Sequence, residues 1–341
     1  MEGPDLLHSR GDQCDSWPLD GLTDRFVELL GLPDGDHEVQ EIADVLRGAL
    51  DLALETDQVE LLRDCLFFAH QRLAARGLTT GDHLWLTHEL ELAAASLLSA
   101  AQLDRLHSLL ALPASDGPAT EPVADSILDR ASATYLHHLL QGDRAGALAL
   151  TRRCVSDGVD MFDILVEVLE PAQREVGRLW ALGKISIAQE HFCTAVTQFV
   201  MTDLYPAFFS GAESSRRLVA VNARGSAHHV GLRMVTDVLE CRDWSTTYVI
   251  EDVADEALPQ LVVEERADLV LISASMAGHV GQVKRMIRAL RDDPRTQAVH
   301  VVVGGRPFSV DPALVQVVGA DGSALDARSA VAVCDSLVGL P

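Results

Sequence analysis

A histidine and a glycine in the stretch Ala-Arg-Gly-Ser-Ala-His-His-Val-Gly are well suited to ligand chemistry. His228 lies three residues before Gly231, just after an apolar run that ends at Ala223. The stretch does not resemble a phosphate loop, because GxGxxG is missing and no lysine follows a glycine run. A neutral imidazole on a loop suits a borderline transition metal. The simpler alternative is that His228 and His229 are ordinary loop histidines.

The elements that position this stretch are strands of a parallel sheet. Four apolar, β-branched runs of strand length, RLVAVNA, TTYVIED, ADLVLISAS and AVHVVVGG, alternate with amphipathic helical stretches. This pattern predicts a parallel sheet with both faces covered by helices. Ligands of such sheets bind at the carboxyl ends of the strands. We therefore expect the chemistry to lie after Ala223, Ser273 and Val303.

The rest of the chain is expected to be helical. Apolar residues at spacings of three and four predict helices over about 20–31, 36–56, 59–75 and from 81 or 82 into 112. PASDGPATEP, residues 113–122, is typical of a linker. Four further helical segments in 123–210 predict an antiparallel bundle, with the third kinked or restarted by Pro171. The predicted domains are thus an all-α domain (1–112), a helical bundle (123–210) and an α/β domain (217–341).

Composition excludes several classes of function. The 27 Lys and Arg residues against 51 Asp and Glu leave a net charge of −24, which argues against binding to nucleic acid or an anionic membrane. Six cysteines lie far apart without a CxxC pair, so a zinc ribbon or a redox dithiol is not expected. The N-terminal residues lack a signal-peptide pattern, and we expect a cytoplasmic protein.

The motif around His228 resembles the His-x-x-Gly element of cobalamin-binding domains, in which Asp-x-His-x-x-Gly supplies the lower ligand of cobalt. The resemblance implies a flavodoxin-like fold over 217–341, with His228 on cobalt and Gly231 beside the displaced nucleotide tail. Ser273 and Ser275 match the family's serine segment beside the nucleotide base, and Gly304 and Gly305 match the point where the tail passes the backbone. The final GADGSALDARSAV matches the family's last turn and helix.

One residue departs from that motif. Ser226 stands where the family has an aspartate. A serine can still form a hydrogen bond, but it cannot push charge onto the imidazole as a carboxylate does. The departure therefore concerns the strength of the cobalt–histidine bond rather than the fold.

The bundle resembles the cap of cobalamin photoreceptors, the light-dependent repressors of carotenoid genes. Trp180 is followed after nine residues by Glu190-His191, which is the pattern of that cap. The resemblance implies that Trp180 covers the upper face of the corrin, with Glu190 and His191 near the upper ligand. The alternative is that Trp180 belongs to the bundle core. Ala181 stands where the repressors carry a histidine that ligates cobalt after light, so that light state is not available here.

A helical domain fused to such a core without a DNA-binding element resembles the photocobilins, which combine cobalamin with a bilin such as biliverdin. The resemblance implies a bilin near the N-terminal helices. A linear tetrapyrrole needs apolar walls, hydrogen-bond partners and cations. Residues that could supply these groups are His70, Arg72, Arg76, His83, Trp85 and His88. The alternatives are a solvated helix surface, or helices that form a dimer.

We therefore expect a non-enzymatic light sensor that binds adenosylcobalamin, forms a homodimer and signals to a downstream protein. Photolysis of the cobalt–carbon bond would remove packing beneath Trp180 and let the bundle move. The main alternative is a corrinoid protein that carries methyl groups between methyltransferases, and a third is a scaffold that has lost the cofactor. A carrier must expose the upper face of cobalt, which the predicted tryptophan lid disfavours.

Overall fold

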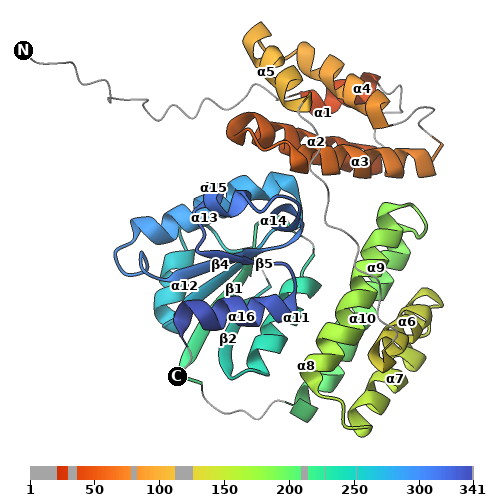
Figure 1. The fold of residues 1–341 in the computed structure, drawn as a ribbon, viewed down its shortest axis with the longest axis vertical. Helices are drawn as coiled ribbons and strands as arrows, with labels where there is room; N and C mark the ends of the chain where they lie inside the picture. Colours follow the sequence, from red (N-terminus) through yellow and green to blue (C-terminus); the bar gives the residue numbers. More distant parts are fainter. Residues whose placement is uncertain are drawn as a thin grey trace, which may run out of the picture.

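The computed structural model contains three bodies, which Figure 1 shows in different colours. It describes residues 21–29, 37–77, 83–111, 126–208, 214–226, 228–250 and 252–339. The N-terminal helices lie across one end of both other bodies: a helical bundle, called the cap bundle from here on (residues 126–208), and an α/β domain (residues 214–339). The predicted linker, 113–122, lies outside the described residues.

The α/β domain contains five parallel strands in the order β2-β1-β3-β4-β5. The strands are β1 (Arg216–Asn222), β2 (Trp244–Val249), β3 (Leu269–Ser273), β4 (His300–Gly304) and β5 (Gly322–Ala324). Register pairs Asn222 with Ser273 and Ser273 with Gly304, so three strands end side by side. The predicted α/β class is confirmed. The sequence analysis missed β5 as a strand, because Gly322-Ser323-Ala324 has no β-branched or large apolar residue.

Both faces of the sheet are covered, as the continuous apolar runs predicted. Along β1, Val219 and Val221 enter one buried cluster, whereas Leu218 and Ala220 enter another. This alternation follows from the two-residue period of a strand. The helical segments of the domain are α11 (Val230–Glu240), α12 (Leu258–Glu265), η2 (Ala277–His279), α13 (Val280–Asp292), α14 (Arg306–Val310), α15 (Leu314–Val318) and α16 (Ala327–Val338).

The cap bundle follows the predicted four-segment plan. Its elements are α6 (Ile127–Leu140), α7 (Arg144–Ser156), a third segment made of α8 (Met161–Asp163), η1 (Ile164–Leu169) and α9 (Glu170–Ala181), and α10 (Ile187–Phe208). The third segment contains a π-helical stretch, η1, that ends just before α9 begins. Pro171 lies in the first turn of α9, directly after η1, so the proline coincides with the change from π-helix to α-helix. The predicted irregularity at Pro171 is thus confirmed.

A polar chain inside the bundle fixes α9 against α10 and α6. The Gln173 amide donates to Thr197 Oγ1 at 2.6 Å, and Thr197 also bonds the Tyr135 hydroxyl at 2.9 Å. Thr194 donates to Gln173 at 3.3 Å and to Glu190 at 2.8 Å. Because buried polar groups must be paired, these bonds select one relative position of the helices.

The N-terminal body consists of α1 (Leu22–Leu29), α2 (His37–Thr56), α3 (Glu60–Ala75), α4 (His83–Ala95) and α5 (Ala100–Leu110). The sequence analysis predicted one long helix where α4 and α5 stand, and this was wrong. The chain breaks because Ser99 accepts a hydrogen bond from the Gln102 backbone N–H and donates to its side chain. This capping box begins a new helix.

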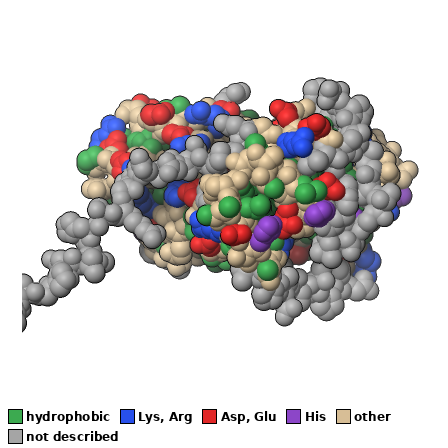
Figure 2. Space-filling model, turned by 90° about the horizontal axis from the view of Figure 1, so that it is seen from above, with side chains coloured by type: hydrophobic (Ala, Val, Ile, Leu, Met, Phe, Trp, Pro, Cys, Tyr) green, Lys and Arg blue, Asp and Glu red, His purple; other side chains and the backbone are tan. Residues whose placement is uncertain are grey.

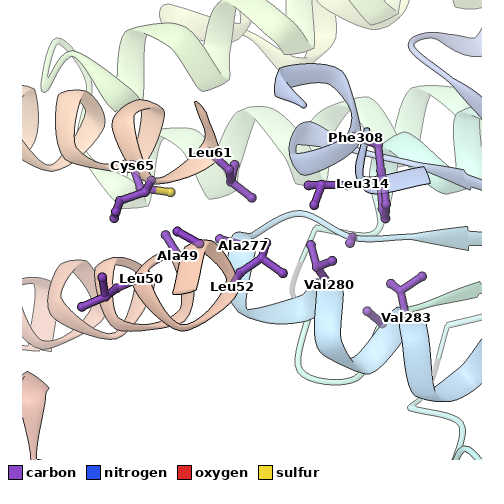
Figure 3. Close-up of a cluster of buried hydrophobic side chains, with 14 of the residues drawn as sticks. Ala49, Leu50, Leu52, Leu61, Cys65, Ala277, Val280, Val283, Phe308 and Leu314 are labelled. Atoms are coloured by element: carbon purple, nitrogen blue, oxygen red, sulfur yellow. The ribbon is translucent and has the colours of Figure 1, made fainter. Parts of the chain in front are cut away.

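An apolar core runs without interruption from the N-terminal helices into the α/β domain. Figure 3 shows Leu52 of α2 close to Ala277 and Val280, and Leu61 of α3 on the side of Phe308 and Leu314. Gly48 of α2 approaches the backbone of η2 so closely that a Cβ there would lie 2.8 Å from the Gly278 Cα. The N-terminal helices and the α/β domain therefore share one hydrophobic core.

The surface agrees with the acidic composition. On the face shown in Figure 2, Lys and Arg side chains lie in small separate groups near acidic ones. Within the described residues, no helix combines the length and hydropathy needed to cross a bilayer.

A buried carboxyl lies where α11 packs against the cap bundle. Asp237 is 8% exposed, and its Oδ2 has no hydrogen-bond partner among the described residues. Burial, opposed by the nearby Arg233 and reinforced by Glu240, raises the pKa of Asp237 to about 7. Tyr205 of α10 donates to Glu240 at 2.8 Å, and Arg233 donates to Thr202 of α10 at 2.9 Å.

Asp237→Asn is expected to stabilise the protein above pH 7. The folded-state pKa is raised, so the stabilising effect of the protonated carboxyl is lost as pH rises through about 7. The variant lacks that loss, so its advantage over the wild type should grow by roughly 3 kcal/mol from pH 5 to pH 8, because about two pH units lie between pH 5 and the folded-state pKa. Urea unfolding at both pH values measures the difference. Asp292→Asn, at an exposed carboxyl, is the control. An equal change of stability with pH in both variants would contradict the raised pKa of Asp237.

Gly305→Ala is expected to destabilise the α/β domain. Gly305 has φ +98°, and a Cβ there would lie 1.9 Å from the Ala274 carbonyl oxygen. Such strain combined with a backbone clash costs about 2 kcal/mol or more. Urea unfolding should show this loss, whereas Gly177→Ala, in open space on α9, should be neutral or stabilising. Equal stability of Gly305→Ala and the wild type would show that the backbone there moves freely.

Candidate functional site

The loops after β1 and β3 meet at the carboxyl edge of the sheet. Ser226 is buried, and its Oγ lies 3.0 Å from the Ser275 Oγ. Ser275 in turn lies 3.4 Å from His279 Nδ1, on η2. The Gly225 N–H donates to Asp252, from the loop after β2, at 3.1 Å. Hydrogen bonds to two other strand ends thus hold the loop that carries His228.

The structure separates the two adjacent histidines. The His229 ring bonds Asn222 at 3.1 Å, and its backbone carbonyl accepts from the Tyr248 hydroxyl at 3.0 Å. His228 is exposed at the carboxyl edge. Burial lowers the pKa of the half-buried His279, and the nearby His228 lowers it further, so His279 favours the neutral form. His228 is therefore the accessible imidazole, and His229 has a structural role.

The other predicted strand-end residues lie where the sequence analysis expected them. The Ser273 carbonyl accepts from the Ala223 N–H at 2.8 Å, and the Gly304 carbonyl accepts from the Ala274 N–H at 3.0 Å. The need for glycine at position 305 is explained by the close approach of the Ala274 backbone alone. A Cβ at Gly231 would meet no atom within 4 Å, so the start of α11 presents bare backbone to open space.

Trp180 lies at the end of α9, against the N-terminal helices. Its ring centroid is 5.5 Å from that of Phe68, and the Arg72 guanidinium lies 4.7 Å from it. The indole Nε1 is buried and has no partner among the described residues. The ring also packs on the bundle core, so a lid role and a core role are both compatible with its position.

Glu190 and His191 begin α10 and bond each other. Glu190 Oε2 lies 2.6 Å from His191 Nδ1, and Oε1 accepts from Thr194. The Glu190 side chain is 13% exposed and that of His191 is 68% exposed. These hydrogen bonds do not involve Trp180, so they do not join the three residues into one cluster.

The bilin candidates are spread over the N-terminal helices. Arg72 is buried and engaged with Trp180 and Glu38, and Arg76 also pairs with Glu38. His70 is half-buried on α3, and His88 is exposed on α4. The side chains of His83 and Trp85 lie outside the described residues. The described candidates do not form a single pocket with free cations.

The residues of the carboxyl edge fit a corrinoid. An exposed imidazole on a loop held by hydrogen bonds is a suitable axial ligand. The open backbone at Gly231, where a Cβ would meet no atom within 4 Å, leaves space beside the start of α11. On the cap side, the buried and unpartnered Trp180 Nε1 is a donor that a ligand could satisfy.

Several residues of this region were not predicted from the sequence. His279, four residues after Ser275, could have been noticed as a titratable group at a strand end. Phe68 and Glu38 carried no signal, because their importance lies in contacts with distant segments of the chain. Asp252 follows β2, whose loop the sequence analysis did not single out.

Two family models, both described as a B12 binding domain, match this chain. One matches residues 132–205, within the cap bundle, and the other matches residues 216–334, within the α/β domain. The two matched ranges thus lie within two of the three bodies, the cap bundle and the α/β domain.

The curated relatives are corrinoid proteins. Monomethylamine corrinoid protein 1 of Methanosarcina acetivorans is 24% identical over 195 residues, which are 55% of this chain and 88% of the relative. The dimethylamine corrinoid protein of Methanosarcina barkeri is 29% identical over 181 residues, 52% of this chain and 83% of the relative.

The solved structure of the Methanosarcina barkeri monomethylamine corrinoid protein shares the fold with a TM-score of 0.54 and 21% identity, covering 60% of this chain and 96% of that one. The two models are described as B12 binding domains and these relatives as methylamine corrinoid proteins, and none of them is described as a photoreceptor. They confirm the cobalamin-binding aspect of the resemblance. Residues 132–205 and 216–334 thus match B12 binding domains, a helical one followed by an α/β one.

Proposed function

We propose that this chain is a light sensor that holds adenosylcobalamin between the cap bundle and the α/β domain. The observation that carries the proposal is the packing of the N-terminal helices on Trp180 and on η2. An alignment of 195 residues already covers 88% of a matched corrinoid protein, so that relative has no room for a counterpart of these helices. An added domain in contact with both sides of the site suits a signalling role better than a carrier role.

His228 would ligate cobalt from the loop after β1. Ser226 and Ser275 would hold that loop. A serine pair donates less electron density to the imidazole than an aspartate does. Trp180 would shield the other face from water, and Glu190 would orient His191 at the rim of the cap. Adenosylcobalamin, when bound, would supply a cobalt–carbon bond that light can break.

The signal would be a change in how the cap bundle packs. Loss of a bulky upper group removes contacts beneath Trp180, and a two-state element shifts when its two states bind a ligand differently. A downstream protein, or a second copy of the chain, would read that change. We do not extend the proposal to biliverdin, because Arg72 already has partners in Trp180 and Glu38.

His228→Ala is expected to remove the protein ligand of cobalt. In the wild type, the electron paramagnetic resonance spectrum of the cobalt(II) form should change when histidine is labelled with ¹⁵N. His228→Ala should lose this response, and His107→Ala, at an exposed residue of α5, should retain it. A labelling response that survives in His228→Ala would mean that another residue ligates cobalt.

Green light is expected to change the absorption spectrum of the protein loaded with adenosylcobalamin. The sedimentation coefficient of the protein should change at the same time. Trp180→Phe should keep the spectral change but reduce the sedimentation change, because photolysis belongs to the cofactor and the response to the cap. A light-induced change in the spectrum without any change in the shape or assembly of the protein would contradict the proposed role as a light sensor.

The second candidate is a corrinoid methyl carrier. The names of the matched relatives, which are methylamine corrinoid proteins, support this candidate more than the first. Methyl transfer in the dark from the protein loaded with methylcobalamin to a thiol, faster than from free methylcobalamin, would favour the carrier. A carrier would need the cap to open, since Trp180 lies against α3 in this structure.

A further inference from the structure

The end of the cap bundle that carries Trp180 contacts the N-terminal helices. Phe68 and Arg72, one turn apart on α3, both face the Trp180 ring, at 5.5 Å and 4.7 Å. Within the connection from α9 to α10, Gly183 with φ +63° leaves room for α3, because a Cβ there would lie 2.2 Å from the Ala75 Cβ. The two helices therefore meet closely over a full turn of α3.

Arg72 makes three contacts at once. Its guanidinium stacks over the Trp180 ring, donates to the Trp180 backbone carbonyl at 2.6 Å and pairs with Glu38 of α2. The carbonyl belongs to the last turn of α9, where a cation is favoured by the helix dipole. The Arg72 side chain is only 8% exposed, so these contacts are shielded from salt and water.

The opposite end of the cap bundle is fixed differently. Met234, Val238 and Ala327 of the α/β domain belong to the buried cluster of the bundle. Tyr205 near the end of α10 donates to Glu240, and Arg328 pairs with Glu167. This end is thus anchored directly on α11 and α16.

The N-terminal helices themselves are fixed to the α/β domain. They share its core, and ion pairs join Arg306 to Asp64 at 2.6 Å and Lys284 to Glu55 at 2.8 Å. In Figure 1, α3 accordingly lies beside the end of α9 while α8 lies at the far end of the bundle. The cap bundle is therefore anchored at one end and held at its Trp180 end by a platform that belongs to the other body.

We propose that Glu38, Phe68 and Arg72 form a latch that holds the Trp180 end of the cap bundle against the N-terminal helices. Arg72 is a positioning residue: it acts on the site through Trp180 and does not touch the cofactor. The latch rests on the proposed function and deepens it, because it names the contact that an upper ligand must strengthen or break. It applies equally to a carrier, whose cap would have to open at the same point.

Fluorine NMR of protein labelled with 5-fluorotryptophan tests the latch without any cofactor. The chain has four tryptophans, and Trp180→Phe assigns the resonance of interest. Arg72→Gln should shift the Trp180 resonance and increase its solvent isotope effect. Arg76→Gln is the matched control, because Arg76 lies one turn away and pairs with the same Glu38 without stacking on Trp180. It should leave the resonance in place.

Ligand exchange tests the same contact in the loaded protein. Cyanide should replace the upper ligand of bound hydroxocobalamin at least about tenfold faster in Arg72→Gln than in the wild type or Arg76→Gln, the effect of losing about 1.4 kcal/mol. Arg72→Lys keeps the buried charge beside Glu38 but loses the planar guanidinium. If Arg72→Gln does not fold, Arg72→Lys should show the same faster cyanide exchange.

An unchanged Trp180 resonance in a folded Arg72 variant would overturn the latch, whether or not cobalamin binds. A shifted resonance in a protein that fails to bind cobalamin would support the latch and refute the proposed function instead. Equal cyanide exchange in the two Arg variants would also overturn it.

Discussion

Parallel pairing of β1, β3 and β4 is the constraint on which the other features of this protein depend. Because Asn222, Ser273 and Gly304 lie in register, the loops that follow them meet at one edge of the sheet. The Ser226–Ser275 hydrogen bond and the contact between Gly305 and the Ala274 carbonyl exist only because of this register. His228 owes its accessible position to the same edge.

The N-terminal helices add a third body to the cap bundle and the α/β domain, the two bodies that match B12 binding domains. They bind the α/β domain through a shared apolar core, as Figure 3 shows, and reach the cap bundle through a small contact around Trp180. A broad apolar interface holds two bodies together strongly, whereas a contact of a few side chains can be broken by a ligand. The cap bundle also shares a buried apolar cluster with α11 and α16, so the contact around Trp180 is the smaller of its two attachments.

The sequence predicted most of the fold because its strands are continuous β-branched runs and its helices are strongly amphipathic. It failed where local signals were weak or ambiguous. β5 lacks large apolar residues, and the break between α4 and α5 depends on a single capping box at Ser99. Of the candidate site, the strand-end residues followed from topology, since their positions depend only on where strands end.

The partners of Trp180 could not be predicted in the same way. Arg72 and Trp180 are separated by 108 positions in sequence, so their contact arises from tertiary packing alone. The most direct test of the central claim is a crystal structure of the protein grown with cobalamin. The account predicts cobalt within bonding distance of a His228 ring nitrogen, with Trp180 on the opposite face of the corrin. A corrin bound elsewhere, or cobalt ligated by a different residue or by the cofactor's own base, would contradict it.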